Sequence, residues 1–302
     1  MDDTKHLELR SSNTLITDRH LYRHEADLAI AELVKSLLLP HTINQVVELG
    51  CGRGRLLPLI TQIENIEITA IDNNPEYIKF AKAAYPSLAE HIHLADIETY
   101  KPTLPVHIFY SMGIHHLMLK QSEHCEYLKK IYQQLLPGGY YILADEFLPD
   151  YIDEQEREVN LVVWYAHIIS QALKHSYREL ALEEAKILLD DILKQRQCDD
   201  NHSLEQIQMV LNDAPEIADA ANYRNIDIAK TLSLSLIDRL DAFYNGQDNR
   251  VKQTTSFTDS KICDRVLRKQ LADVGFKVID ITTIGPDAPI GAVCVYTLKK
   301  TS

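Results

Sequence analysis

Short apolar runs that alternate with helical stretches most constrain how this chain can fold. Five such runs fall within residues 41–150 and have the length of buried strands: Gln45–Leu49, Ile66–Ile71, His91–Ala95, Val106–Tyr110 and Tyr140–Ala144. Helical apolar spacing fills most of the intervals, a pattern that favours a parallel sheet covered on both faces. Two more runs, Phe276–Thr283 and Ala292–Leu298, lie near the C-terminus. We therefore expect an α/β fold with a seven-stranded sheet.

A long segment without glycine interrupts this alternation. Between residues 151 and 245 the sequence has one proline, Pro215, and helical apolar spacing throughout. The segment also carries 18 acidic and 9 basic residues, so it accounts for most of the negative charge of the chain. We expect an all-helical insertion whose three helices have apolar faces within residues 159–173, 182–192 and 229–243. Gly246 is expected to end the last of these helices.

The insertion lies between the fifth strand and the following helix, and it sets the expected division of the chain. The expected parts are an N-terminal helical segment, a core in two pieces and a helical cap: residues 1–40, residues 41–150 with 250–302, and residues 151–249. In the first part we expect a helix over 24–39 that ends at Pro40. In the second piece of the core, a helix over about 258–274 precedes the last two strands.

Composition and charge limit the class of protein and its partners. The chain has 302 residues, of which 45% are hydrophobic and 25% charged, as in folded globular proteins. Its formal charge of −13 opposes a phosphate-binding surface, so nucleic acid is not an expected partner. The first residues lack a signal-peptide pattern, and the longest nearly apolar run, 161–169, is too short to span a bilayer. With five singly spaced cysteines, these features favour a cytoplasmic protein with no membrane partner.

The strongest local motif is an apolar strand that runs into a glycine-rich turn, Val46-Val47-Glu48-Leu49-Gly50-Cys51-Gly52-Arg53-Gly54. Glycine lets backbone N–H groups approach a ligand closely, and a helix that begins here would add the positive end of its dipole. A Walker-type phosphate loop would need Gly-Lys-Ser/Thr at its end, which is missing. A dinucleotide fingerprint would need a small residue where Arg55 or Leu57 stands. The pattern that remains is Glu-x-Gly-x-Gly-x-Gly.

An acidic residue, Asp72, lies at the tip of the second expected strand, 22 positions after Gly50. With this pair of features the sequence resembles the class I S-adenosylmethionine (SAM)-dependent methyltransferase family. Four further segments match the pattern of that family in order: Leu94–Asp96, Tyr110–Leu117, Leu135–Tyr140 and Ala272–Phe276. The resemblance covers about residues 20–149 and 255–300 and leaves out the insertion. It implies a Rossmann-like fold, SAM as the cofactor and S-adenosylhomocysteine (SAH) as its product.

The resemblance also implies which residues would hold SAM. The residues that match cofactor positions are, in chain order, Glu48, Gly50, Cys51, Gly52, Gly54, Asp72, Asn73, Asp96, Ile97, Ser111 and Met112. The glycine loop would surround the methionine end, and Asp72 would accept hydrogen bonds from the ribose hydroxyls. Asp96 with Ile97 would contact the adenine. Ser111 and Met112 would lie beside the sulfonium.

The same polar residues also allow structural interpretations. Glu48 and Asp72 could fix a loop or cap a helix, and Asp96 could be a turn residue. Arg53 and Arg55 could attract the carboxylate of SAM, or they could be solvated at a helix N-terminus.

Three residues near the ends of the fourth and fifth strands are candidates for acid–base catalysis: His115, His116 and Glu146. Histidine accepts a proton near neutral pH, and such help is typically worth about 10²–10⁴-fold in rate. Each of the three could instead cap a helix, pack or lie on the surface. We expect no metal site, because the spaced pairs His20 with His24 and His91 with His93 have no carboxylate or thiolate partner nearby in the sequence.

The acceptor is expected to be a small molecule, bound beneath the helical insertion, which would act as a lid. Tyr22, Trp164, Tyr165 and Ile168 could line its pocket, although aromatic residues at helical spacing also serve as plain core. The last insertion helix carries Ile228, Leu234 and Ile237 opposite its main apolar face, which also allows a homodimer through the insertion. Two alternatives stay open: a protein methyltransferase, and a SAM-binding protein without transfer activity.

Overall fold

The computed structural model describes residues 23–117, 121–195, 202–222, 225–245, 261–285 and 293–301, and these fall into two compact units. The sheet unit comprises the described parts of Tyr22–Phe147, Ser260–Ile284 and Val293–Ser302. The helical unit lies within Leu148–Asp259. Each is described by itself below.

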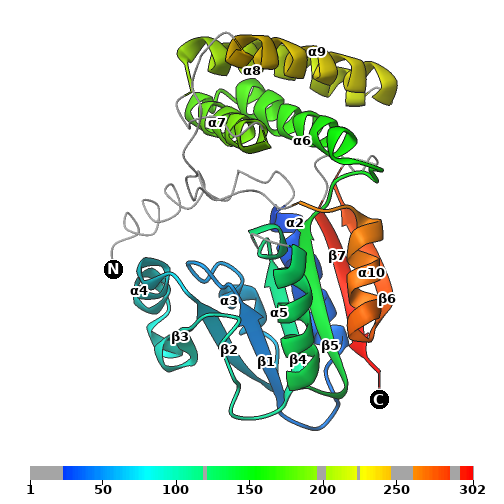
Figure 1. Ribbon diagram of the computed structural model, residues 1–302. Helices are drawn as coiled ribbons and strands as arrows, with labels where there is room; N and C mark the ends of the chain where they lie inside the picture. Colours follow the sequence, from blue (N-terminus) through cyan, green and yellow to red (C-terminus); the bar gives the residue numbers. More distant parts are fainter. Residues whose placement is uncertain are drawn as a thin grey trace. The chain divides into compact units, whose positions relative to one another are not determined.

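The sheet unit is built on one mixed sheet of seven strands, as expected (Figure 1). The strands are β1 (Asn44–Leu49), β2 (Ile66–Asp72), β3 (Ile92–Leu94), β4 (Val106–Met112), β5 (Leu135–Glu146), β6 (Phe276–Ile284) and β7 (Val293–Lys300). Their order across the sheet is β3-β2-β1-β4-β5-β7-β6. The first five in this order are parallel, and β7 runs antiparallel to β5 and β6. The carboxyl ends of β1, β2, β4 and β5 therefore meet at one edge, where ligands bind in such sheets.

Helices cover both faces of this sheet. The helical segments of the unit are α2 (Arg23–Ser36), α3 (Leu57–Ile60), α4 (Pro75–Ala84), η1 (Pro86–His91), η2 (His115–Leu117), α5 (Gln121–Gln134) and α10 (Asp264–Val274). Residues of α2, α3 and α4 share one core with the first face, and residues of α5 and α10 share a second core with the other. Figure 1 shows α5 and α10 in front of the sheet and α2 behind it. Because side chains alternate along a strand, neighbouring positions at the strand ends face opposite cores.

Several expected boundaries in the sheet unit were wrong by a few residues. The helix expected to open after the glycine loop, for which no end was predicted, is the single turn of α3, and Pro58 lies in its first turn, where proline is tolerated. Strand β5 starts earlier than expected, at Leu135, where a register shift between Val106 and Ile108 lets it pair with β4. The helix expected from 258 begins at Asp264 in the described part of the chain.

The helical unit contains four long helices, one more than the three expected faces suggested. They are α6 (Glu154–Lys174), α7 (Arg178–Gln195), α8 (Leu204–Asn222) and α9 (Ile226–Asn245). Helix α8 was missed, and it contains Pro215 in its interior. A reciprocal pair of hydrogen bonds at its start, between Ser203 and Gln206, satisfies backbone donors that a helix leaves open there. Gly246, expected to end α9, lies outside the described residues.

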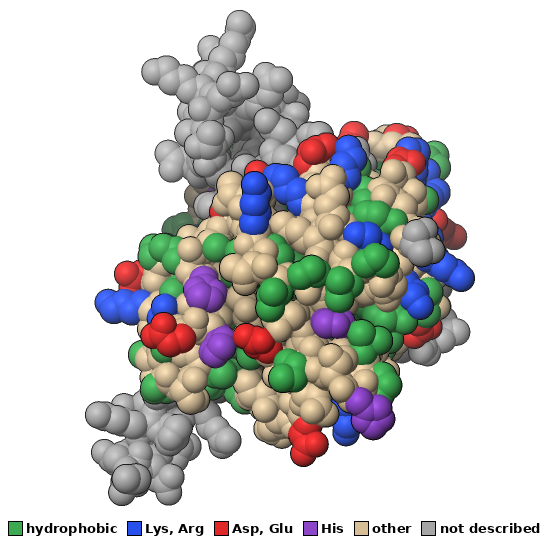
Figure 2. Space-filling view, turned by 90° about the horizontal axis from the view of Figure 1, so that it is seen from below, with side chains coloured by type: hydrophobic (Ala, Val, Ile, Leu, Met, Phe, Trp, Pro, Cys, Tyr) green, Lys and Arg blue, Asp and Glu red, His purple; other side chains and the backbone are tan. Residues whose placement is uncertain are grey.

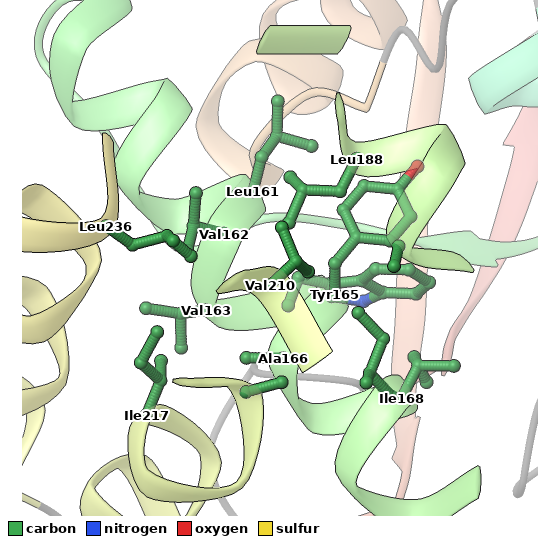
Figure 3. Packing of buried hydrophobic residues seen from close by; sticks show 14 of the residues in the cluster. Leu161, Val162, Val163, Tyr165, Ala166, Ile168, Leu188, Val210, Ile217 and Leu236 are labelled. Carbon is green, nitrogen blue, oxygen red and sulfur yellow. The ribbon is translucent and has the colours of Figure 1, made fainter. Parts of the chain in front are cut away.

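Helix α6 is the centre of the helical unit, because almost every side chain from Glu158 to Ala172 is buried. Figure 3 shows Val162 and Ala166 of this helix among Val210 and Ile217 of α8 and Leu236 of α9. A helix that is apolar on all sides is stable only with partners around it, so the four helices form a core of their own.

None of the described helices is both long and apolar enough to cross a membrane. On the face drawn in Figure 2, acidic and basic side chains are interspersed with hydrophobic ones.

Candidate active site

The glycine loop that follows β1 combines close packing with an open position. Gly50 and Gly52 have φ angles of +68° and +53°, which side chains rarely adopt. A methyl group at Gly50 would come within 2.4 Å of Cγ2 of Ile114, whereas one at Gly52 would meet no atom within 4 Å. The loop is therefore pressed against the segment after β4 at Gly50 and leaves space beside its backbone at Gly52.

Asp72 ties this loop to the end of β2. Its Oδ2 accepts a hydrogen bond from the backbone N–H of Gly52 at 2.8 Å, and its Oδ1 accepts one from Asn74 at 2.8 Å. The loop-fixing role that the sequence left open is thus real. A carboxylate has about four lone-pair positions, so the same group can still accept hydrogen bonds from two ribose hydroxyls.

Glu48 is a buried carboxyl group directly before the glycine loop. Tyr110, its neighbour on β4, donates a hydrogen bond from Oη to Oε2 at 3.0 Å. Burial raises the pKa of Glu48 to about 8, the hydrogen bond from Tyr110 lowers it, and the nearby charge of Asp72 raises it again. A buried carboxylate of this kind is stabilised by a cation. The ammonium group at the methionine end of SAM has that charge, so the residues present fit this cofactor.

Three of the expected adenine and ribose residues surround the ends of β2 and β3. The backbone N–H of Ala95 bonds to the carbonyl of Asp72 at 2.9 Å, which brings the turn after β3 beside Asp72. Within this turn Asp96 is exposed, accepts a hydrogen bond from the N–H of Glu98 at 2.7 Å, and is followed by half-buried Ile97. Asn73 is exposed next to Asp72. The side chains of Asn73 and Asp96 are therefore accessible to solvent beside Asp72.

Met112 and Ser111, the residues expected nearest the sulfonium, point to opposite faces of the sheet. Met112 is buried on the face that also holds Glu48 and Tyr110. The hydroxyl of Ser111 instead bonds to Oη of Tyr141 at 2.7 Å, inside the opposite core. Any contact of Ser111 with the cofactor would therefore be made by its backbone and not by its hydroxyl. Cys51 is buried, and burial raises the pKa of its thiol, so it contributes to the loop as a small apolar residue.

The carboxylate next to Glu146 on β5, Asp145, organises the turn after β4. Its Oδ2 accepts hydrogen bonds from the backbone N–H groups of His115 at 2.6 Å and His116 at 3.1 Å. Its Oδ1 lies 2.5 Å from Nδ1 of His116 and also accepts from the N–H of Glu146. Burial raises the pKa of Asp145, but the charge and hydrogen bonds of its partners, His116 first, outweigh burial and lower it. Asp145 is therefore ionised at neutral pH.

His115 belongs to a buried chain of hydrogen bonds on the α5 side of the sheet. Its Nδ1 lies 2.9 Å from Oη of Tyr127, which lies 3.1 Å from Oη of Tyr141, which in turn reaches Ser111. All four residues are fully buried or nearly so. These hydrogen bonds link α5, β5 and β4 and fix the imidazole of His115.

Glu146, the third catalytic candidate, forms a buried ion pair. Nζ of Lys261, which lies before α10, is 3.4 Å from Oε2 of Glu146, and both side chains are almost inaccessible to solvent. Alternation along β5 directs Glu146 and Asp145 to opposite faces. Lys261 was not expected at the site, because no motif surrounds it in the sequence.

Both arginines of the glycine loop have protein partners. Arg55 forms an ion pair with buried Asp27 of α2, so it anchors that helix to the loop. The guanidinium of Arg53 lies over the rings of Tyr77 and Phe80 of α4, 5.6 and 5.1 Å from their centres. Such stacking holds the Arg53 side chain beside the loop.

Three of the expected acceptor residues lie in the helical unit, which is described by itself. Trp164, Tyr165 and Ile168 are buried in the core of the helical unit. Figure 3 shows Tyr165 and Ile168 within this core, and the hydroxyl of Tyr165 donates a hydrogen bond to Oδ2 of Asp191 at 3.4 Å. Tyr22 and His20 lie outside the described residues. Within the described ranges, no three His, Cys, Asp or Glu side chains come together as metal ligands would.

Comparisons with known proteins found a matching family model and a similar curated protein. Residues 46–139 match a family model described as "Methyltransferase domain". A curated carboxy-S-adenosyl-L-methionine synthase from Hamiltonella defensa is 25% identical over 172 residues, a match that covers 55% of this chain and 64% of that protein. This chain thus spans less than two thirds of that relative.

The chain is also similar to solved structures. A possible exported protein from Bordetella parapertussis aligns with a TM-score of 0.50 and 15% identity, covering 93% of this chain and 69% of that one. The N-methyltransferase NodS from Bradyrhizobium japonicum, in complex with SAH, aligns with a TM-score of 0.47 and 9% identity over 95% of this chain and 91% of that one. The first likeness shows a shared fold.

Proposed function

We propose that this chain, whose core is a class I SAM-dependent methyltransferase domain, transfers a methyl group to a small-molecule acceptor. The observation that carries the proposal is the arrangement at the carboxyl edge of the sheet. The open glycine loop is tied to Asp72 and lies beside the buried carboxyl group of Glu48.

In this proposal the cofactor residues have separate tasks. Glu48 and the loop from Gly50 to Gly54 hold the methionine end, and Asp72 with Asn73 holds the ribose. Asp96 and Ile97 border the adenine, while Met112 lies at the reacting end. When bound, SAM supplies a methyl group already activated by its sulfonium. The protein therefore has to align the acceptor and exclude water.

A small-molecule acceptor is favoured over a nucleic acid because the chain has a net charge of −13. From the chain order alone, we propose that the acidic helical insertion, which follows β5 directly, serves as a lid. A cytoplasmic location and a homodimer through the insertion belong to the same proposal. A protein acceptor with a basic surface is the competing case, since an acidic insertion would attract it.

The test is incubation of the full chain with SAM and a metabolite mixture, followed by mass spectrometry of the cofactor. The proposal predicts SAH formation that depends on added metabolites and is lost in Asp72→Ala. SAH formation that requires added protein in place of the metabolites would establish the competing case. A gain of mass on SAM itself would instead indicate chemistry like that named for the curated relative.

A further inference from the structure

We infer that the methyl acceptor is a hydroxyl group, that His116 removes its proton, and that Asp145 is the positioning residue for His116. This inference rests on the proposed methyl transfer and names the substrate class for the same site. It starts from the three acid–base candidates, which the structure places in very different surroundings.

Accessibility separates the three candidates. His115 is 1% exposed, and its Nδ1 is engaged with Tyr127. Glu146 is 5% exposed and paired with Lys261. The side chain of His116 is 13% exposed. Of these three, His116 is the one that a substrate can reach without unpacking the core.

The contact with Asp145 prepares His116 to accept a proton. A carboxylate can only accept hydrogen bonds, so in the neutral ring Nδ1 carries the proton and donates it to Oδ1 at 2.5 Å. The atom of the neutral ring that takes up a proton is then Nε2. A carboxylate in this position also stabilises the imidazolium that forms.

The histidine is fixed close to the cofactor loop. Ile114, two residues before His116, lies against Gly50 so closely that a methyl group there would overlap with it. Asp145 holds the backbone of His115 and His116 from the neighbouring strand. The ring and the turn that carries it are thus both tied to the edge of the sheet where the glycine loop lies.

A fixed base is needed for some acceptors and not for others. A carboxylate is already ionised at neutral pH, and a free amine attacks with its own lone pair. A hydroxyl must lose its proton as it reacts. The acceptor oxygen forms a bond to the methyl carbon while the carbon–sulfur bond breaks and leaves its electron pair on sulfur. The hydroxyl proton passes to Nε2 of His116 and later to solvent, so the products are the methyl ether, SAH and one proton.

The buried carboxylate of Asp145 also orients the imidazole of His116. Removing Asp145 from water is costly unless its partners offset that cost. The three backbone hydrogen bonds of Asp145 fix the turn. The fourth contact, to the imidazole, offsets the burial of the carboxylate and also fixes the tautomer and the direction of the ring.

The closing experiment supplies methyl-¹³C SAM to the full chain with three matched acceptor pools: phenols and alcohols, amines, and carboxylic acids. The chemical shift of the transferred carbon identifies the atom to which it is bound. We expect oxygen-bound ether methyl from the hydroxyl pool only, reduced about 10²–10⁴-fold in His116→Gln. His93→Gln, an exposed histidine on β3, is the matched control and should leave transfer unchanged.

A second readout does not depend on turnover. In ¹⁵N-histidine spectra, we expect neutral His116 to be protonated at Nδ1, and Asp145→Asn to shift it toward the Nε2-protonated form, as an amide can donate to the ring. Transfer to amines or carboxylic acids that survives His116→Gln overturns the inference, and so does an Nε2-protonated ring in the wild type. Intact SAM binding with no transfer to any pool overturns the proposed function and this inference with it.

Discussion

Nδ1 of His116 lies 2.5 Å from Oδ1 of Asp145, although the two residues are 29 positions apart in the chain. The contact joins the turn after β4 to the end of β5, and it exists because these strands pair in register, with Met112 opposite Ala144. The geometry of the candidate active site is therefore a property of the sheet as well as of the turn.

The two loop glycines should fail in different ways when a methyl group is added. Gly50→Ala adds an overlap with Ile114 to the cost of a positive φ, about 1–2 kcal/mol for the backbone alone. Gly52→Ala bears only the backbone cost, but its methyl group enters the open space beside the loop. We expect Gly50→Ala to lose more stability in urea denaturation, and Gly52→Ala to lose mainly SAM affinity by calorimetry.

Gly138→Ala is the matched control for this pair. Gly138 has φ +76° and no atom within 4 Å of an added methyl group, and it lies at the start of β5, away from the carboxyl edge. It should lose about as much stability as Gly52→Ala and keep its SAM affinity. Equal loss of affinity in both variants would contradict the placement of the cofactor at Gly52.

Glu48 should make the unliganded protein less stable as the pH rises. Its pKa in the folded state, about 8, lies above the ordinary value of 4.5, so folding favours the protonated form. The contribution is fully present below about pH 4.5 and is lost as the pH rises through about 8. Thermal unfolding should show Glu48→Gln losing less stability than the wild type over this range. Glu67→Gln, at an exposed position of β2, should follow the wild type.

The buried tyrosine chain should contribute to stability more than a surface tyrosine does. Tyr127→Phe removes the hydroxyl between His115 and Tyr141, and leaving buried polar groups without that partner costs about 1–3 kcal/mol. Tyr132→Phe removes a hydroxyl that bonds to Thr301 at the surface and should cost less than about 0.5 kcal/mol. Urea denaturation compares the stabilities of the two variants. Equal losses of stability would show that the hydrogen bonds of the buried tyrosine chain are not coupled.

Removing only one partner of the ion pair between Lys261 and Glu146 should lower the stability of the fold. Lys261→Met leaves a carboxylate in a buried position, and such losses are about 3–5 kcal/mol. Lys261→Met combined with Glu146→Gln should recover most of this stability. Lys269→Met, which breaks an exposed pair with Asp273, is the control and should cause no measurable change. Strictly additive losses in the double variant would argue against a direct interaction.

The sequence predicts the elements of the sheet unit well because its signals are local. Apolar runs such as Val46–Leu49 are buried strands, and Asp72 and Asp96 occupy the ends where the motif expects them. In the helical unit, we expected helical spacing throughout but assigned no separate helix to residues 204–222, where α8 lies with Pro215 in its interior and with Val210 and Ile217 in the shared core.

The partners at the site could not be predicted in the same way. The pairing of His116 with Asp145, and of Glu146 with Lys261, depends on strand register and on the face to which each side chain points. Ser111 illustrates the difficulty, since its position at the end of β4 was foreseen but its hydroxyl faces Tyr141 in the opposite core. An alternation argument along β5 could have separated Asp145 from Glu146. No local signal pointed to Lys261.

The most direct test of the central claim is thermal unfolding of the full chain with and without SAM and SAH. A ligand at 100 times its dissociation constant stabilises the folded state by about 2.7 kcal/mol. The account predicts a higher midpoint for the wild type and for Asp280→Ala, an exposed control on β6, and no ligand-induced shift for Asp72→Ala. A wild-type midpoint that neither ligand moves, or an Asp72→Ala variant that responds fully, would contradict the account.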